Sequence, residues 1–141
     1  MSAVDLDRFT AAYRRNTDAL DRGDPEAAFG WMGPDFEWHV LADSLPADIR
    51  PDAPPVLKGR EAVVAYFGEL IEDWDWRPRG QEFTDGGDRT VVVHATGTMR
   101  GRASGLRGEV RFTQVWELSE DGVPIRVRER LDDYWLEGTR S

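Results

Sequence analysis

The sequence predicts an α+β fold in one domain, with three N-terminal helices packed on the concave face of a curved, mainly antiparallel sheet. Apolar residues recur at helical spacing in the first half of the chain and at alternate positions from residue 76 onward. The later segments are separated by Asp-Gly-rich stretches that are typical of tight turns between antiparallel strands. Helices followed by such a meander predict an α+β architecture, and 141 residues fit a single domain spanning 1–141.

Each helix is indicated by an apolar stripe and by residues that are typical of helix starts and ends. The first covers residues 5–22, where the stripe is interrupted by Asn16. A glycine ends it, and an Asp-Pro pair then begins a short second helix that extends to about residue 32. The third follows Gly59 and carries apolar residues three and four positions apart as far as residue 74.

Five strands are expected from period-two alternation, at residues 36–40, 76–84, 89–100, 108–118 and 123–131. Residues 41–58 contain four prolines, which argue against both a helix and a central strand. A loop of this length inside a small domain is usually functional, so the segment is a candidate lid over a site.

Composition excludes several classes of function. Eighteen basic against 27 acidic residues give a net charge of −9, which disfavours nucleic acid as a partner. The absence of cysteine excludes disulfides, thiol catalysis and cysteine-ligated metals. No apolar run is long enough to span a membrane, so we expect a soluble, cytoplasmic protein. His39 and His94 lie in no metal-binding motif, and neither a metal nor another cofactor is expected.

Four segments together resemble the SnoaL-like branch of the nuclear transport factor 2-like (NTF2-like) superfamily, which includes the ketosteroid isomerases. They are LDRGDPEAA at 20–28, FEWHV at 36–40, KGREAV at 58–63, and the closing WEL, DG, Arg128 and LD over residues 116–132. The resemblance implies the cone-shaped fold of that superfamily. It leaves the chemistry open, because these proteins include isomerases, cyclases, dehydratases, epoxide hydrolases and noncatalytic binding domains.

The resemblance also implies where known sites would fall. The three catalytic positions of ketosteroid isomerases correspond to Asn16, Trp38 and Gln114, so the general base of those enzymes is missing here. The last-strand aspartate of limonene-epoxide hydrolases corresponds to Glu129, while their other two catalytic positions fall on Ala95 and Gly97. The acid/base carboxylate of SnoaL-type cyclases has Glu129 and Asp132 as its only local candidates.

Three polar residues interrupt apolar faces of three separate elements: Asn16, Gln114 and Glu129. Glu129 shares its face with Ile125, Val127 and Leu131, while the adjacent arginines point the other way. A carboxyl group buried in such a row has a raised pKa, as an acid/base catalyst near neutral pH requires. The competing interpretation is a purely structural network, or an arginine from elsewhere that neutralises Glu129.

An apolar, aromatic-rich pocket is the expected setting for these polar groups. The residues predicted to line it are Tyr13, Trp38, Tyr66, Phe112, Trp116 and Val127. The alternative is that the tryptophans simply build the core.

The sequence therefore favours a protein that binds a small hydrophobic molecule in a largely apolar cavity. As an enzyme it would be a cofactor-free acid/base catalyst, with Glu129 transferring the proton and Asn16 and Gln114 orienting the substrate. The alternative is a noncatalytic ligand-binding or protein-interaction module on the same fold. We also expect a homodimer, because the outer face of an open sheet usually needs covering and such pairing is common in the superfamily.

Overall fold

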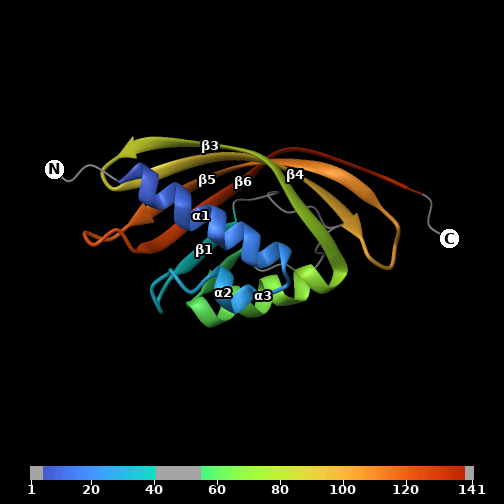
Figure 1. Cartoon of the computed structure of the whole chain (residues 1–141), viewed down its shortest axis with the longest axis horizontal. Coiled ribbons are helices and arrows are strands. Elements are labelled where there is room, and N and C mark those ends of the chain that lie inside the picture. Colours follow the sequence, from blue (N-terminus) through green and yellow to red (C-terminus); the bar gives the residue numbers. More distant parts are fainter. Residues whose placement is uncertain (1–4, 41–54, 139–141) are drawn as a thin grey trace.

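A strongly curled sheet with helices on its concave side forms the molecule (Figure 1). The structure is a computed structural model that describes residues 5–40 and 55–138. Its elements are α1 (Leu6–Asp21), α2 (Pro25–Ala28), β1 (Glu37–Val40), β2 (Val56–Lys58), α3 (Arg60–Asp73), β3 (Trp74–Gly87), β4 (Thr90–Gly101), β5 (Arg107–Leu118) and β6 (Pro124–Glu137). The predicted α+β class and the three helices on the concave side are confirmed.

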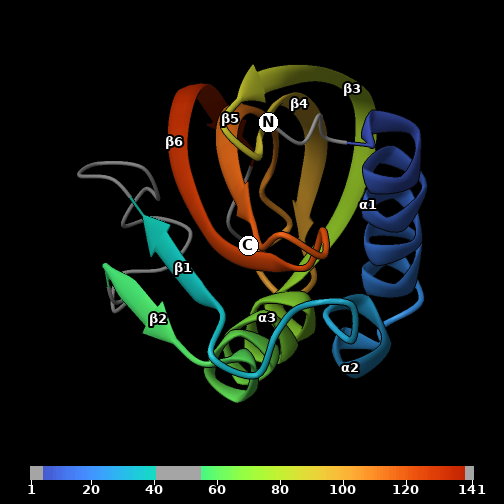
Figure 2. The ribbon, with the colours of Figure 1, turned by 90° about the vertical axis from the view of Figure 1, so that its left-hand side faces the viewer.

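Within the described ranges, six strands form one mixed sheet in the order β2-β1-β6-β5-β4-β3. Neighbouring strands are antiparallel except for β1 and β6, which run parallel. Figure 2 shows α1 lying beside the β3 end of the curled sheet, with α3 closing the bottom of the half-barrel. The concave face of the sheet is thus turned toward α1 and α3.

The helices begin where their capping residues predict. Asp5 accepts a hydrogen bond from the Arg8 backbone N–H at the start of α1, and Asp24 does the same for Ala27 at the start of α2. The second helix is shorter than expected, because α2 ends at Ala28 and the chain then turns instead of remaining helical as far as residue 32.

The core is an aromatic cluster around Trp116, which is 1% exposed. Its indole ring packs against five other aromatic rings from α1, β1 and the chain between α2 and β1: Phe9, Tyr13, Trp31, Phe36 and Trp38. Aromatic pairs of this kind contribute roughly 0.5–1.5 kcal/mol each beyond the burial of their area. The cluster therefore holds the indole N–H groups of Trp38 and Trp116 in fixed positions.

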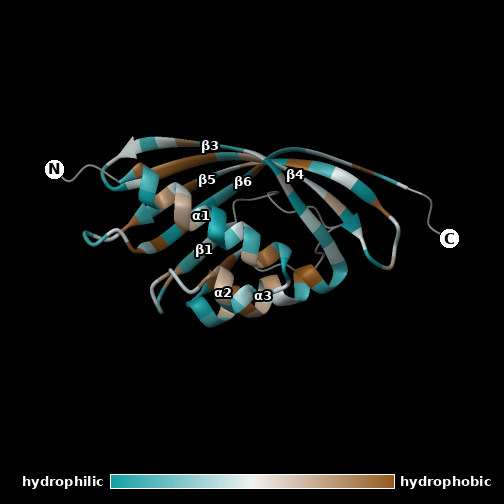
Figure 3. Ribbon diagram, viewed as in Figure 1, coloured by the Kyte–Doolittle hydropathy of each residue, from teal (hydrophilic) through white to brown (hydrophobic). Residues whose placement is uncertain are grey.

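Polar and apolar residues alternate along the long strands (Figure 3). On β4 the odd-numbered residues from Val91 to Met99 face the helices, and the even-numbered ones face outward or lie half-buried. No helix in the described part of the chain is both long and apolar enough to cross a membrane.

The structure also corrects two strand assignments and the face assigned to Ile125. Residues 56–58 form the edge strand β2, although the whole of 41–58 was expected to be a loop; the lid predicted for the rest of that segment lies outside the described residues. Strand β6 continues to Glu137 instead of ending near residue 131. Ile125 is 48% exposed and does not share the inner face with Val127, because a register shift beside Leu118 leaves it unpaired in the ladder.

Candidate active site

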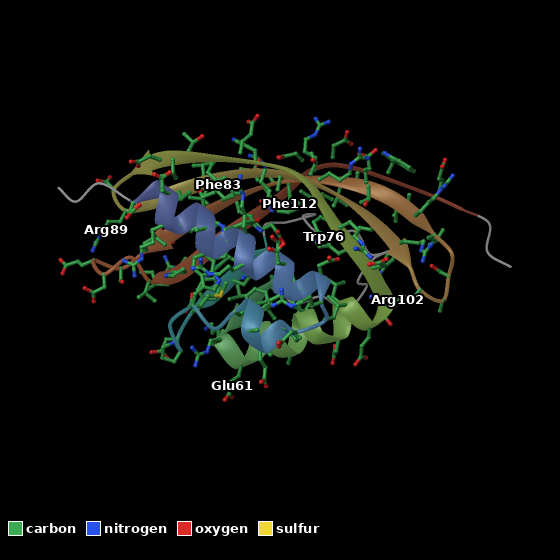
Figure 4. All side chains as sticks on the ribbon, in the orientation of Figure 1. Glu61, Trp76, Phe83, Arg89, Arg102 and Phe112 are labelled. Carbon is green, nitrogen blue, oxygen red and sulfur yellow. The ribbon has the colours of Figure 1, made fainter. Side chains whose placement is uncertain are left out.

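A cavity of about 130 Å³ lies between the concave face of the sheet and the helices α1 and α3. At roughly 10–15 Å³ per water-sized site, this is room for about ten water molecules or a small organic ligand. Its walls are mostly apolar and aromatic, with a few polar side chains among them. Figure 4 shows Phe83, Phe112 and Trp76 on the concave side, between the sheet and the helices. This composition is typical of sites for small apolar molecules.

Glu129 brings a carboxyl group to this cavity from β6. Its Oε1 accepts a hydrogen bond of 3.0 Å from the Gln114 side-chain amide, and its Oε2 accepts one of 3.4 Å from the Trp38 indole N–H. Strand pairing explains both contacts, because Gln114 faces Glu129 across the β5–β6 ladder and β1 pairs with the other side of β6. The carboxyl group is therefore held in place by residues from β5 and β1.

Gln114 is 3% exposed, and its amide has a single orientation that satisfies its neighbours. Its Oε1 accepts hydrogen bonds from the Tyr13 hydroxyl at 2.8 Å and from the Trp116 indole N–H at 2.9 Å. Because an indole N–H can only donate, the atom beside it must be the amide oxygen, and the amide NH₂ is left to point at Glu129. The aromatic core thus determines that Gln114 donates to Glu129.

Burial raises the pKa of the Glu129 carboxyl group, and the hydrogen bonds from Gln114 and Trp38 oppose this shift only in part. Burial, together with the nearby Glu129 carboxylate, also raises the pKa of the Tyr13 hydroxyl far above its usual value. Tyr13 therefore remains a neutral donor at physiological pH. Glu129 is a half-buried residue that lines the cavity, so it can exchange a proton with a molecule bound there.

Asn16 is also buried, at 7% exposed, and lines the same cavity from α1. It does not belong to the hydrogen-bond network of Tyr13, Gln114, Trp116 and Glu129. No residue in the ranges 5–40 and 55–138 makes a hydrogen bond to the side-chain amide of Asn16. The three predicted polar residues therefore border one cavity, but only two of them contact each other.

Most residues predicted to line the pocket do so: Tyr13, Trp38, Tyr66, Phe112 and Trp116. Val127 does not. It is fully buried in the core and takes no part in the cavity wall, because its side chain packs within the apolar cluster at the β1 side of the sheet.

Asp132, the other carboxylate considered, is exposed and makes its contacts away from the cavity, with the Thr113 hydroxyl and with Arg130. Burial of its carboxyl group, which would raise its pKa, is outweighed by these hydrogen bonds and by the charge of Arg130, so its pKa is lowered. His39 pairs with Glu37, and His94 lies on the outer face beside Thr113. In the described residues, no three side chains of His, Asp or Glu cluster so as to hold a metal ion.

The sequence analysis missed one polar residue of the cavity, Gln81 on β3. Counting alternate positions from Trp76 places Gln81 on the outer face. A register shift between Pro78 and Gly80 inserts one residue and reverses the faces, so Trp76 and Gln81 both line the cavity. The Arg-Gly pair before it hints at such an irregularity.

The chain matches a known protein family and has the same fold as several solved structures. Residues 13–127 match the family of SnoaL-like domains. No curated protein matches this sequence. An NTF2-like protein of Burkholderia thailandensis is 25% identical, with a TM-score of 0.67 over 86% of this chain and 88% of that one.

Two more distant structures share the fold. A candidate isomerase of Bacillus subtilis superposes with a TM-score of 0.75 at 13% identity, covering 89% of this chain and 87% of that one. SalBIII, an epoxide hydrolase/cyclase-like enzyme that takes part in pyran ring formation in salinomycin, superposes with a TM-score of 0.67 at 16% identity, covering 94% and 98%. The family match, which extends over most of the chain, is the decisive finding: this protein belongs to the SnoaL-like domain family, within the NTF2-like superfamily.

Proposed function

We propose that this protein is a cofactor-free acid/base enzyme that acts on a small, largely apolar molecule, and that Glu129 transfers the proton. The observation that carries the proposal is the position of the Glu129 carboxyl group, which lines an apolar cavity and is oriented through both oxygens by Gln114 and Trp38. A raised pKa lies closer to neutral pH, where the carboxyl group can both accept and return a proton.

The simplest reaction that this arrangement supports is proton transfer at carbon. The Glu129 carboxylate takes a proton from a C–H next to a carbonyl group, and the electron pair of that bond moves into the carbonyl to give an enolate. The protonated Glu129 then returns a proton to the same or another carbon. Charge and protons balance without any further reactant, and the same carboxyl group could protonate the oxygen of an opening epoxide.

Gln114 acts as a positioning residue in this proposal. Its amide NH₂ holds the Glu129 carboxylate, and its oxygen is fixed by Tyr13 and Trp116. A proton-transferring group works best when its geometry is set before the substrate arrives.

A simple ketone tests the proposal without knowledge of the natural substrate. 2-Tetralone is a bicyclic, apolar ketone with acidic protons at C1, and exchange of these protons for deuterium in D₂O can be followed by NMR. We expect the protein to accelerate the exchange and Glu129→Gln to lose at least about a hundredfold of that acceleration, which is the lower range for a general base. Glu82→Gln, the same change at an exposed position on β3, should leave the acceleration of exchange unchanged.

A noncatalytic binding protein is the alternative, and the same experiment separates the two. Binding of 2-tetralone with no accelerated exchange, or acceleration that persists in Glu129→Gln, contradicts the enzymatic proposal. The large apolar share of the cavity wall is compatible with a pure binding role, whereas an oriented, buried carboxyl group is not needed for one.

A further inference from the structure

The Asn16 side chain presents an unsatisfied amide to the cavity. It is 7% exposed, it borders the cavity, and no group in the described ranges hydrogen-bonds to it. Because the Asn16 amide borders the cavity, a molecule bound there can supply the hydrogen bonds that the protein does not. The neighbouring Thr17 cannot serve it as a donor, because its hydroxyl donates to the Arg14 carbonyl oxygen within α1.

Gln81 is a second carboxamide on the cavity wall. The inner residues of β4 fix its direction: Ala95 and Val93 face inward, and their partners on β3 are Gln81 and Phe83. Gln81 is half-buried and, like Asn16, has no hydrogen-bond partner among the described residues. Two amides of the same chemistry therefore border the same cavity from α1 and β3.

The packing of α1 on β3 brings these two positions to the same level. At the middle of α1, the Tyr13 ring contacts the Phe83 ring, and the two ring centroids are 5.3 Å apart. At the C-terminal end of α1, Asp21 pairs with Arg77 at 3.3 Å. Asn16 lies between Tyr13 and Asp21 on the helix, and Gln81 lies between Phe83 and Arg77 on the strand. Asn16 and Gln81 therefore occupy the same stretch of the α1–β3 seam.

Within this seam, Gln81 on β3 lies across the sheet from Glu129, whereas Tyr13 on α1 reaches Gln114, the donor to Glu129. Glu129 is on β6, and the strands β5 and β4 separate β6 from β3. Three interstrand spacings correspond to about 14 Å measured across the strands of the sheet, and the side chains shorten the gap by reaching inward. The wall between them carries apolar side chains, including Phe112 and Ala95 in the cross-strand row that ends at Gln81.

We propose that Asn16 and Gln81 form a polar subsite that binds a neutral oxygen atom, a hydroxyl or a carbonyl, at the end of the ligand remote from Glu129. A carboxamide both donates and accepts, so a pair of them recognises a hydroxyl or carbonyl and carries no charge to attract an ion. The proposal rests on the proposed function in requiring that the cavity bind a small apolar molecule. It identifies that molecule as one with an oxygen function at each end.

Two matched ketones test the subsite. 6-Hydroxy-2-tetralone carries a hydroxyl across the two rings from the ketone of 2-tetralone. We expect wild-type protein to bind the hydroxylated ketone about tenfold more tightly, as measured by isothermal titration calorimetry. In Gln81→Leu and in Asn16→Leu, the affinity for 6-hydroxy-2-tetralone divided by that for 2-tetralone should fall to one or below. The affinity for 2-tetralone itself should stay the same or rise. Glu82→Gln, which points the other way on the same strand, should keep the wild-type ratio.

Both leucine variants replace amides that have no partner in the described structure, so they are expected to fold; circular dichroism and a thermal melt check this. Equal affinities for the two ketones in wild type, or a preference that persists in both variants, overturn the subsite. Failure of both ketones to bind wild-type protein overturns the subsite together with the proposed function. A hydroxyl preference that depends on Asn16 and Gln81, without any exchange at C1, supports the subsite and rejects only the catalytic role of Glu129.

Discussion

Glu129 and its two donors show how a carboxyl group is placed in an apolar cavity without losing its reactivity. Gln114 and Trp38 each donate to one carboxyl oxygen, which stabilises the ionised form. Burial acts in the opposite direction and prevails, so the pKa of Glu129 is raised. The balance leaves a group that is oriented and still able to change its protonation state.

The raised pKa of Glu129 predicts a specific pH dependence of stability. The folded protein holds the Glu129 proton more tightly than the unfolded chain, whose glutamate pKa is about 4.3. The stabilisation from this group is therefore fully present below the unfolded pKa and is lost as the pH rises through the folded pKa. We expect the free energy of unfolding of wild type, measured in urea relative to Glu129→Gln, to fall over that interval.

A structural ion pair would give the opposite result. In that case Glu129→Gln would leave a buried cation without its partner and would destabilise the protein by about 3 kcal/mol at neutral pH. Glu82→Gln serves as the baseline, because it removes one exposed charge and should show neither trend. Marked destabilisation of Glu129→Gln confined to neutral pH would contradict the role proposed for it.

Individual cavity residues were predictable where the strands are regular. Gln114 and Glu129 stand out because each interrupts an apolar row of a regular ladder, and Asn16 because it interrupts a helical stripe. Gln81 was missed and Ile125 was assigned to the wrong face, because each lies beside a register shift, which inserts one residue and reverses the alternation. Alternation alone cannot locate such an insertion, since it depends on the partner strand.

At the level of elements, the end of the cavity nearest α3 depends on close packing between β3 and β4. The Trp76 indole lies directly on Gly97, where an added Cβ would come within 2.3 Å of the ring. Only glycine leaves room for the indole at this position. The pair therefore sets the position of an aromatic ring that lines the cavity.

Gly97→Ala should displace the Trp76 ring and lower the free energy of unfolding by about 1–3 kcal/mol, the usual range for overpacking. Urea denaturation followed by circular dichroism measures this loss. Gly30→Ala is the matched control, because its added Cβ would lie 3.5 Å from the nearest atom, an ordinary contact. Equal stability of the two variants would show that the indole moves aside without cost.

The starts of the helices were predictable, whereas the end of α2 and the strand at the sheet edge were not. Asp24 and Gly59 are local signals, and the helices begin beside them. Strand β2 has only three residues and follows a proline-rich segment, so nothing in its own sequence distinguishes it from a loop. It is a strand because β1 offers it an edge to pair with.

For the whole molecule, the outer face of the sheet supports the expectation of a homodimer. Val92 and Val115 are half-buried there, and Trp135 on β6 is 45% exposed. Burying such a surface against a second copy would remove apolar area from water. Light scattering at micromolar concentration should give twice 16.0 kDa, about 32 kDa, and Trp135→Glu should shift the mass toward 16.0 kDa. A mass of 16.0 kDa for wild type would contradict the prediction.

The parallel pairing of β1 with β6 has a consequence for how the protein folds. The pairing joins residues 37–40 to residues 126–129, so it closes a loop of most of the chain. Contacts of such long sequence separation slow folding, because the entropy of loop closure is lost before they form. During synthesis on the ribosome, Trp38 emerges long before Glu129, so β1 cannot pair with β6 until the last strand has been made. The carboxyl group and its indole partner therefore come together only when synthesis has passed β6, so a shortened chain lacks the proton-transfer site even where its helices have already formed.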